Sequence, residues 1–130
     1  MRLSQDQSRR YARQLFLDEV GAEGQRRLLE ATVALHGEGH AVEEAATYLA
    51  AAGVGRVILS PPLAEVLRPK LEALNPDVSV LLEGTATVTI ASIEPASRLA
   101  GSAVALTTLV GLTGAATPPS FPGVEAVIQW

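Results

Sequence analysis

The sequence predicts one α/β domain with a mostly parallel sheet and two helices ahead of its first strand. The main observation is an apolar run, 31–36, that leads through a glycine turn into a helical segment, 40–52. A short run that is apolar on both faces is typical of a central parallel strand. A second β run, 56–60, follows the helix. Residues 31–60 therefore predict a strand-helix-strand unit.

The remaining elements follow from capping and turn signals. Ser4 is a candidate N-cap for a first helix that runs to Leu17, and residues 18–24 predict a break. We expect further helices at 25–30, 63–74 and 98–114, and further strands at 78–82, 85–90 and 124–129. A single domain, 1–130, is thus expected to contain a helical arm (1–30), a Rossmann-like half (31–82) and a strand-helix-strand end (83–130).

Composition and charge exclude several classes of protein. With 130 residues, 48% of them apolar and 18% charged, the chain can bury one globular core. The absence of cysteine excludes disulfides, thiolate metal sites and cysteine nucleophiles. A net charge of −4 argues against nucleic-acid binding, which needs clustered cations. The uncharged stretch 99–124 contains several glycines and threonines, so it favours a buried helix over a membrane span. The start has no apolar signal stretch, so we expect a cytoplasmic protein.

The glycine turn predicts a phosphate cradle that is altered from the usual pattern. Gly37 and Gly39 hold the first two positions of a G-x-G-x-x-G motif, whereas the third position holds Val42. Such glycines allow a tight turn and a close backbone approach to phosphate at a helix N-terminus. However, acidic side chains crowd this end, so its partial positive charge is expected to be neutralised without an anion. They are Glu38, Glu43 and Glu44.

Two histidines flank the same turn. Histidines four residues apart suit metal ligation when both stand on one helix, but His36 lies on the strand side of the turn and His40 on the helix side. A surface or core role is the more ordinary one for such residues. We therefore expect no metal site here.

Several short segments, taken in order, resemble one known family. They are Arg10 to Gln14, Gly24 to Leu28, the glycine turn, Tyr48 to Ala50, Ala52 to Gly55, and Pro69-Lys70 ahead of Leu74 to Asp77. They resemble the ThiF/MoeB/HesA superfamily of ubiquitin-activating-enzyme-like adenylyltransferases, and residues 99–129 carry a weaker similarity. The resemblance implies a Rossmann-like three-layer sheet and a truncated, degenerate member. Known members use ATP and magnesium to adenylate the C-terminal carboxylate of a ubiquitin-like or sulfur-carrier protein, and most are homodimers.

The resemblance also assigns nucleotide-binding roles to four residues. Arg13 matches an arginine that reaches the ATP phosphates from the neighbouring subunit, and Lys70 matches a lysine that contacts them. Gly37 and Gly39 match the turn beneath the nucleotide. Cations at these places would stabilise charge that develops during adenylation. The alternative is that all four persist only as residues of the fold.

The resemblance also shows what this chain lacks. Where the family has an acidic residue that holds the ribose, this chain has Ser60 followed by two prolines. The family's magnesium-binding strand end has no counterpart just after Leu82, where Glu83-Gly84 and threonines follow. The cysteines that bind zinc or form thioesters in the family are absent as well. We therefore expect no catalytic residue and no resident metal.

These observations leave three hypotheses on function. The first is a non-catalytic protein-binding or dimeric scaffold without a cofactor, in which helix 99–114 and an edge strand at 85–90 are covered by self-association. The second is a minimal adenylyltransferase or nucleotide sensor that binds ATP and magnesium in a homodimer and acts on a ubiquitin-like or sulfur-carrier protein. The third, a nicotinamide-dinucleotide oxidoreductase, is disfavoured because Ser60 replaces the ribose acid.

Overall fold

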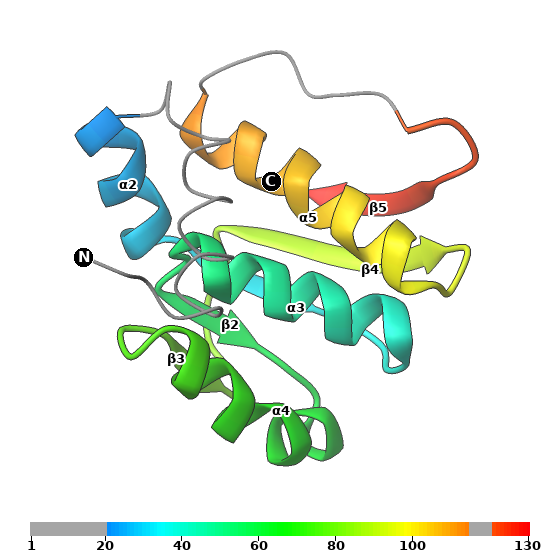
Figure 1. The fold of residues 1–130 in the computed structure, drawn as a ribbon, viewed down its shortest axis with the longest axis horizontal. Helices are drawn as coiled ribbons and strands as arrows, with labels where there is room; N and C mark the ends of the chain where they lie inside the picture. The colour runs from blue at the N-terminus through cyan, green and yellow to red at the C-terminus, as the bar shows by residue number, and fades with distance from the viewer. Residues whose placement is uncertain (1–20, 115–120) are drawn as a thin grey trace, which may run out of the picture.

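The computed structural model describes residues 21–114 and 121–130. Within these ranges, five strands form one sheet and four helices pack against it (Figure 1). The elements are α2 (Gly21–Glu30), β1 (Thr32–Leu35), α3 (His40–Ala52), β2 (Arg56–Ile58), α4 (Pro61–Leu74), β3 (Ser79–Leu81), β4 (Val88–Glu94), α5 (Arg98–Thr113) and β5 (Glu125–Gln129).

The sheet has the strand order β3-β2-β1-β4-β5. The first four strands are parallel, and β5 runs antiparallel to β4. Val33 of β1 lies opposite Val57 and Val88, and Val57 lies opposite Val80, so one row of buried valines crosses the sheet. The predicted class, α/β with a Rossmann-like and mostly parallel sheet, is confirmed.

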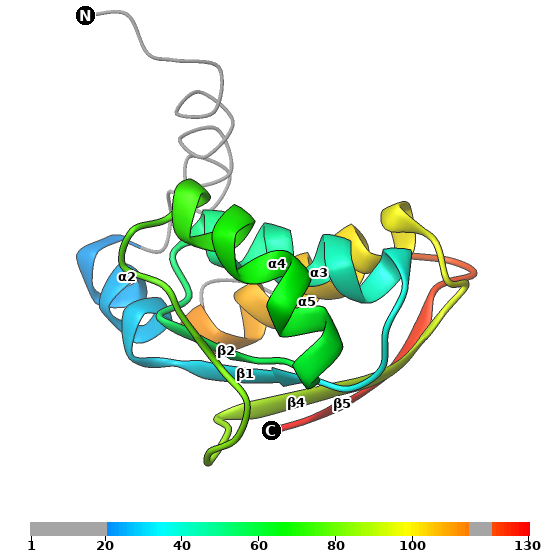
Figure 2. The ribbon, with the colours of Figure 1, turned by 90° about the horizontal axis from the view of Figure 1, so that it is seen from below.

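The helices that cover the sheet lie on one of its faces (Figure 2). On the other face, Ile58 and Leu81 are partly exposed and Val127 is half exposed. The described residues thus form two layers, and the second helical layer of the three-layer prediction is not among them. One reason is that the link from β3 to β4, residues 82–87, contains no helix that would cross to the other face.

Two predicted boundaries were wrong. A break was predicted at 18–24, but residues 21–24 already belong to α2, which begins at Gly21. Within α2, Arg26 pairs with Glu23 and Glu30 along one helix face and so stabilises the longer helix. The strand predicted at 85–90 is β4, which begins at Val88 and continues to Glu94. The first helix, 4–17, lies outside the described residues.

The strand predicted to be an edge is also placed differently. β4 lies between β1 and β5, so the sheet edges in the described part of the chain are β3 and β5. The reason is that the last strand turns back and pairs antiparallel with β4. Among the helices of the described ranges, none combines the length and the apolar character needed to cross a membrane.

Close contact between α3 and α5 fixes the start of α3. A Cβ atom built on Gly101 of α5 would lie well under 3.0 Å from the carbonyl oxygen of Ala41, the second residue of α3. The facing side chains are small, with Ala45, Ala100 and Ala105 almost fully buried. Small side chains let the two backbones approach, so α5 sets the position of the helix end that follows the glycine turn.

Candidate nucleotide site at the strand ends

The glycine turn adopts the backbone that its sequence predicts. Gly37 has φ 101° and Gly39 has φ 105°, a region that favours glycine over every other residue. Crowding does not explain the glycines, because a Cβ on Gly37 would meet Val42 only at 3.8 Å and one on Gly39 would meet nothing within 4 Å. The structure thus brings both predicted glycines together in an open turn between β1 and α3.

The N-terminus of α3 offers backbone N–H groups. Gly39 is its N-cap and makes no side-chain capping bond, since glycine has no side chain. The first N–H groups of an α-helix have no partner within the helix and carry part of its positive dipole. An anion of suitable size could accept hydrogen bonds at this end.

A nearby arginine compensates the negative charge of two glutamates at this helix end. Nη2 of Arg98 lies 3.7 Å from Oε2 of Glu43, and Nη1 of Arg98 lies 3.7 Å from Oε2 of Glu44. Ser102 also donates to Glu44 over 3.4 Å. The sequence predicted that these glutamates neutralise the helix end, but the structure shows that Arg98 of α5 compensates two of them. Arg98 lies 58 residues from His40 in the sequence, so only the fold brings it here.

A small pocket lies where β1 and β2 end. Its volume is about 140 Å³, well below the 300–1,000 Å³ of ordinary small-molecule sites. Its lining, as far as the described residues form it, is mostly apolar and contains no acidic side chain. The lining residues are Ala34, Leu35, His36, Gly37, Ile58, Leu59, Ser60 and Leu82.

Ser60 stands at the place that the sequence marked for a missing ribose acid. It is the N-cap of α4 but makes no side-chain capping bond, and its Oγ is buried without a hydrogen-bond partner. Pro61 and Pro62 occupy the first turn of α4 and lack N–H groups. The end of β2 therefore presents one hydroxyl and few backbone donors to a ligand.

Of the two predicted cations, the structure describes only Lys70, and this residue does not line the pocket. Lys70 is exposed on α4, ten residues after the helix N-cap, which corresponds to about 15 Å along the axis. It does not line the pocket beside Gly37. Arg13 lies outside the described residues. The phosphate-binding roles of Arg13 and Lys70 remain predictions.

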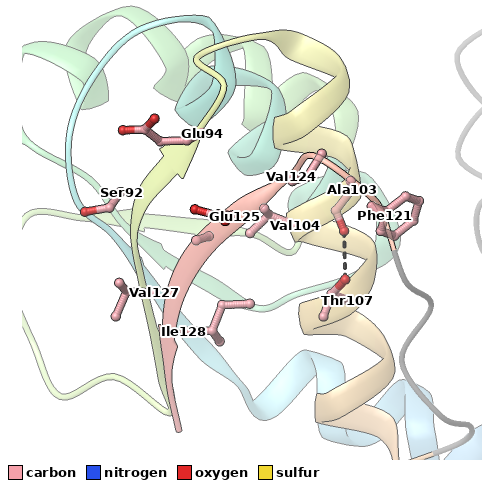
Figure 3. A pocket seen from close by; sticks show the side chains of 11 residues that line it. Ser92, Glu94, Ala103, Val104, Thr107, Phe121, Val124, Glu125, Val127 and Ile128 are labelled. Carbon is pink, nitrogen blue, oxygen red and sulfur yellow. Dashed lines mark hydrogen bonds between the residues drawn. The ribbon is translucent and has the colours of Figure 1, made fainter.

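A second, larger pocket of about 630 Å³ lies between α5 and the ends of β4 and β5 (Figure 3). Val104 of α5 and Val124 contribute to its apolar lining, and Glu94 and Glu125 to its acidic lining. These two glutamates stand opposite each other in the β4–β5 ladder. Like charges directly opposite destabilise a strand pair, so this end of the sheet favours a donor or cation nearby.

The sequence alone did not point to Glu94. The fourth strand was predicted to end at Ile90, but β4 continues to Glu94. The predicted end of this strand was wrong. The alternation of buried residues is interrupted between Ile90 and Ile93, where Ser92 has φ 57° and the register with β5 shifts, so the period-two pattern did not mark the longer strand. Glu94 lines the larger pocket and not the one beside Gly37.

The histidines do not form a metal centre in the part of the chain that the structure describes. Nδ1 of His40 lies 3.1 Å from Nη2 of Arg98, a cationic group, and His36 is exposed. No group of three or more metal-ligating side chains occurs among residues 21–114 and 121–130.

ATP with magnesium does not fit the pocket beside the glycine turn. The pocket is too small for a nucleotide, and among residues 21–114 and 121–130 no carboxylate lines it that could hold the ribose or a magnesium ion. What remains is a set of N–H groups at the start of α3 and one buried hydroxyl. This arrangement can hold a small anion or a single sugar-sized group.

The sheet order and the glycine turn after its central strand define an α/β protein of the Rossmann-like class. No family model matches the chain. It is 32% identical over 93 residues to the sulfur carrier protein ThiS adenylyltransferase of Escherichia coli, covering 55% of this chain and 37% of that protein. It is 36% identical over 102 residues to a sulfur carrier protein adenylyltransferase of Thermus thermophilus, covering 62% and 38%. These similarities support membership of the ThiF/MoeB/HesA superfamily.

The fold agrees with this assignment. The crystal structure of E. coli MccB with succinimide superposes with a TM-score of 0.67 at 14% identity, covering 92% of this chain and 71% of that one. The chain spans little more than a third of the length of the two sulfur-carrier adenylyltransferases. It therefore corresponds to a part of such a protein and not to its whole length.

Proposed function

We propose that this domain is a catalytically degenerate ThiF/MoeB-like module that acts by binding protein, as a homodimeric scaffold. The observation that carries the proposal is the pocket at the strand ends, because it is about 140 Å³ in volume and has no acidic lining residue. Adenylation needs a bound nucleotide and a metal that neutralises its phosphates. A site without room or carboxylates for either supports binding without catalysis.

The relatives suggest the kind of partner. The E. coli and T. thermophilus relatives are named as adenylyltransferases of sulfur carrier proteins. We propose that a ubiquitin-like or sulfur-carrier protein is also the partner of this domain. A module that has lost the nucleotide can keep the surface that contacts such a protein, because fold surfaces and chemistry change separately.

Nucleotide titration tests this proposal directly. The protein is melted with ATP, AMP and NAD, each at 1 mM, with and without magnesium. A ligand that binds with a dissociation constant of 10 μM would add about 2.7 kcal/mol to the free energy of unfolding, or roughly 8–14 °C in Tm. We expect no shift above 1 °C with any of the three, while the E. coli ThiS adenylyltransferase serves as the positive control. A shift with magnesium and ATP would refute the scaffold proposal.

The alternative is a minimal ATP-binding adenylyltransferase or nucleotide sensor. One observation favours it: the glycine turn keeps its open, positive-φ backbone. This alternative predicts that Lys70→Ala and Arg13→Ala each weaken ATP binding about tenfold or more.

A further inference from the structure

The outer edge of β5 is open in the described structure. β5 is the last strand of the sheet, and no described strand pairs with its outer side. An edge strand presents unpaired N–H and C=O groups and is a template for pairing with another chain. β5 is five residues long, whereas the opposite edge strand, β3, has only three. Val127 is 50% exposed on β5, and Trp130, just beyond it, is 63% exposed.

We infer that a second copy of this chain pairs with β5 in an antiparallel register, about a two-fold axis at Val127. The two strands then form one continuous ten-stranded sheet. In this register Val127 lies opposite its own copy, Ala126 lies opposite Ile128, and Glu125 lies opposite Gln129. All five residues of β5 are paired, whereas an axis at Ala126 or at Ile128 pairs only three of them.

The side chains support this register. No like charges stand directly opposite each other across the axis, and the Gln129 amide can donate to the carboxylate of Glu125. Within one copy, Glu125 already lies opposite Glu94, an unfavourable pair. A donor from the second copy offsets that repulsion on the other side of Glu125. A self-complementary edge of this kind is what an isologous dimer requires.

The pairing also brings a side chain to the larger pocket. Val124, Ala126, Ile128 and Trp130 alternate onto the face covered by α5, and a Cβ built on Gly111 of α5 would contact the Trp130 ring. In the dimer, Trp130 of the second copy lies opposite Val124. Val124 lines the 630 Å³ pocket together with apolar side chains of α5 (Figure 3). The second copy therefore places its Trp130 next to a residue of the pocket lining.

A single cysteine tests the register. The chain has no cysteine, so Val127→Cys can form a disulfide only between two copies. Residues directly opposite in an antiparallel pair have Cα atoms about 4.5–5.5 Å apart, which a disulfide can bridge. We expect Val127→Cys to become a covalent dimer under mild oxidation at low micromolar concentration. The matched control is Val66→Cys, because Val66 is an exposed apolar residue, 67% accessible, on α4; it should stay monomeric on a non-reducing gel.

Charge substitutions at Gln129 test the same contact in both directions. Two Glu125–Gln129 pairs occur in each dimer, so each substitution acts twice. Gln129→Lys should tighten the dimer roughly fivefold and Gln129→Glu should loosen it roughly fivefold in sedimentation equilibrium. Circular dichroism checks that each variant is folded. A monomeric wild-type protein up to about 100 μM, or equal effects of both substitutions, would overturn the inference.

The inference rests on the proposed function only in treating the domain as a homodimer. A wild-type dimer in which Val127→Cys fails to cross-link would disprove the β5 interface but leave the scaffold proposal intact. A nucleotide-dependent shift in Tm would disprove the scaffold proposal but leave the cross-linking result unaffected. The two failures are therefore distinguishable.

Discussion

Two glycines in the same helix, α5, should respond in opposite ways to the same substitution. Replacing glycine by alanine inside a helix gains roughly 0.5–1 kcal/mol from the reduced flexibility of the unfolded chain. At Gly101 the new methyl group would collide with the backbone carbonyl of Ala41, well under 3.0 Å away, which only a shift of α3 against α5 can relieve. Overpacking of this kind costs about 1–3 kcal/mol. We expect Gly101→Ala to lower the free energy of unfolding by about 2 kcal/mol.

At Gly111 the same methyl group meets the ring of Trp130 instead. That side chain is 63% exposed, so it can rotate aside at small cost. We expect Gly111→Ala to be neutral or to stabilise the protein by about 0.5 kcal/mol, because the gain in helix propensity remains.

The two variants are compared by urea unfolding followed by circular dichroism, and by Tm. A change of 1 kcal/mol corresponds to roughly 3–5 °C for a domain of this size. Gly101→Ala should therefore melt about 6–10 °C below the wild type and Gly111→Ala at or above it. If Gly101→Ala is as stable as the wild type, α3 and α5 are not in the close contact that positions the glycine turn.

Two further predictions concern polar groups. Asn75 is buried; its side chain donates to the carbonyl of Ala50 over 3.0 Å and accepts from the N–H of Asp77 over 3.0 Å. The Ala50 carbonyl keeps a second donor, the N–H of Gly53, but Asn75→Ala removes both side-chain bonds, so we expect a loss of about 2 kcal/mol in urea unfolding. A loss under 0.5 kcal/mol would contradict this. Hydrogen bonding and charge from Arg26 hold the pKa of Glu23 below its ordinary value. A carboxyl group whose pKa is lowered by folding stabilises the protein above that pKa, and this stability is lost as the pH falls through the lowered pKa. Arg26→Gln should therefore raise the Glu23 pKa in an NMR titration and weaken the dependence of Tm on acid pH. An unchanged Glu23 pKa would refute the role given to Arg26.

Local signals in the sequence were sufficient for the strand-helix-strand unit. The helix predicted at 40–52 is α3 with the same bounds, because a glycine turn precedes it and Gly53, with φ 111°, ends it. The parallel pairing of β1 and β2 follows from the helix that connects them. Likewise, the open backbone of Gly37 and Gly39 was predictable, since it depends only on residues adjacent in the chain.

The errors lie where distant residues decide. Arg98 compensates two glutamates at the start of α3, and no local pattern links α5 with α3. β4 proved to be interior because the last strand folds back beside it. The role of Glu94 was missed for the same reason, since its neighbour in the ladder, Glu125, lies 31 residues later in the chain. Non-local contacts of this kind are not encoded in the periodicity of either segment.

The sequence by itself determined the α/β class, the glycine turn, and the replacement of the ribose acid by Ser60, since each depends on residues adjacent in the chain. Only the tertiary structure decided the size of the pocket beside Ser60, the neutralisation of Glu43 by Arg98, and the exposure of β5 as a sheet edge. The physical reason is that volume, charge compensation and edge exposure arise between segments. They exist only once the packing of α3, α5 and the sheet has brought those segments together.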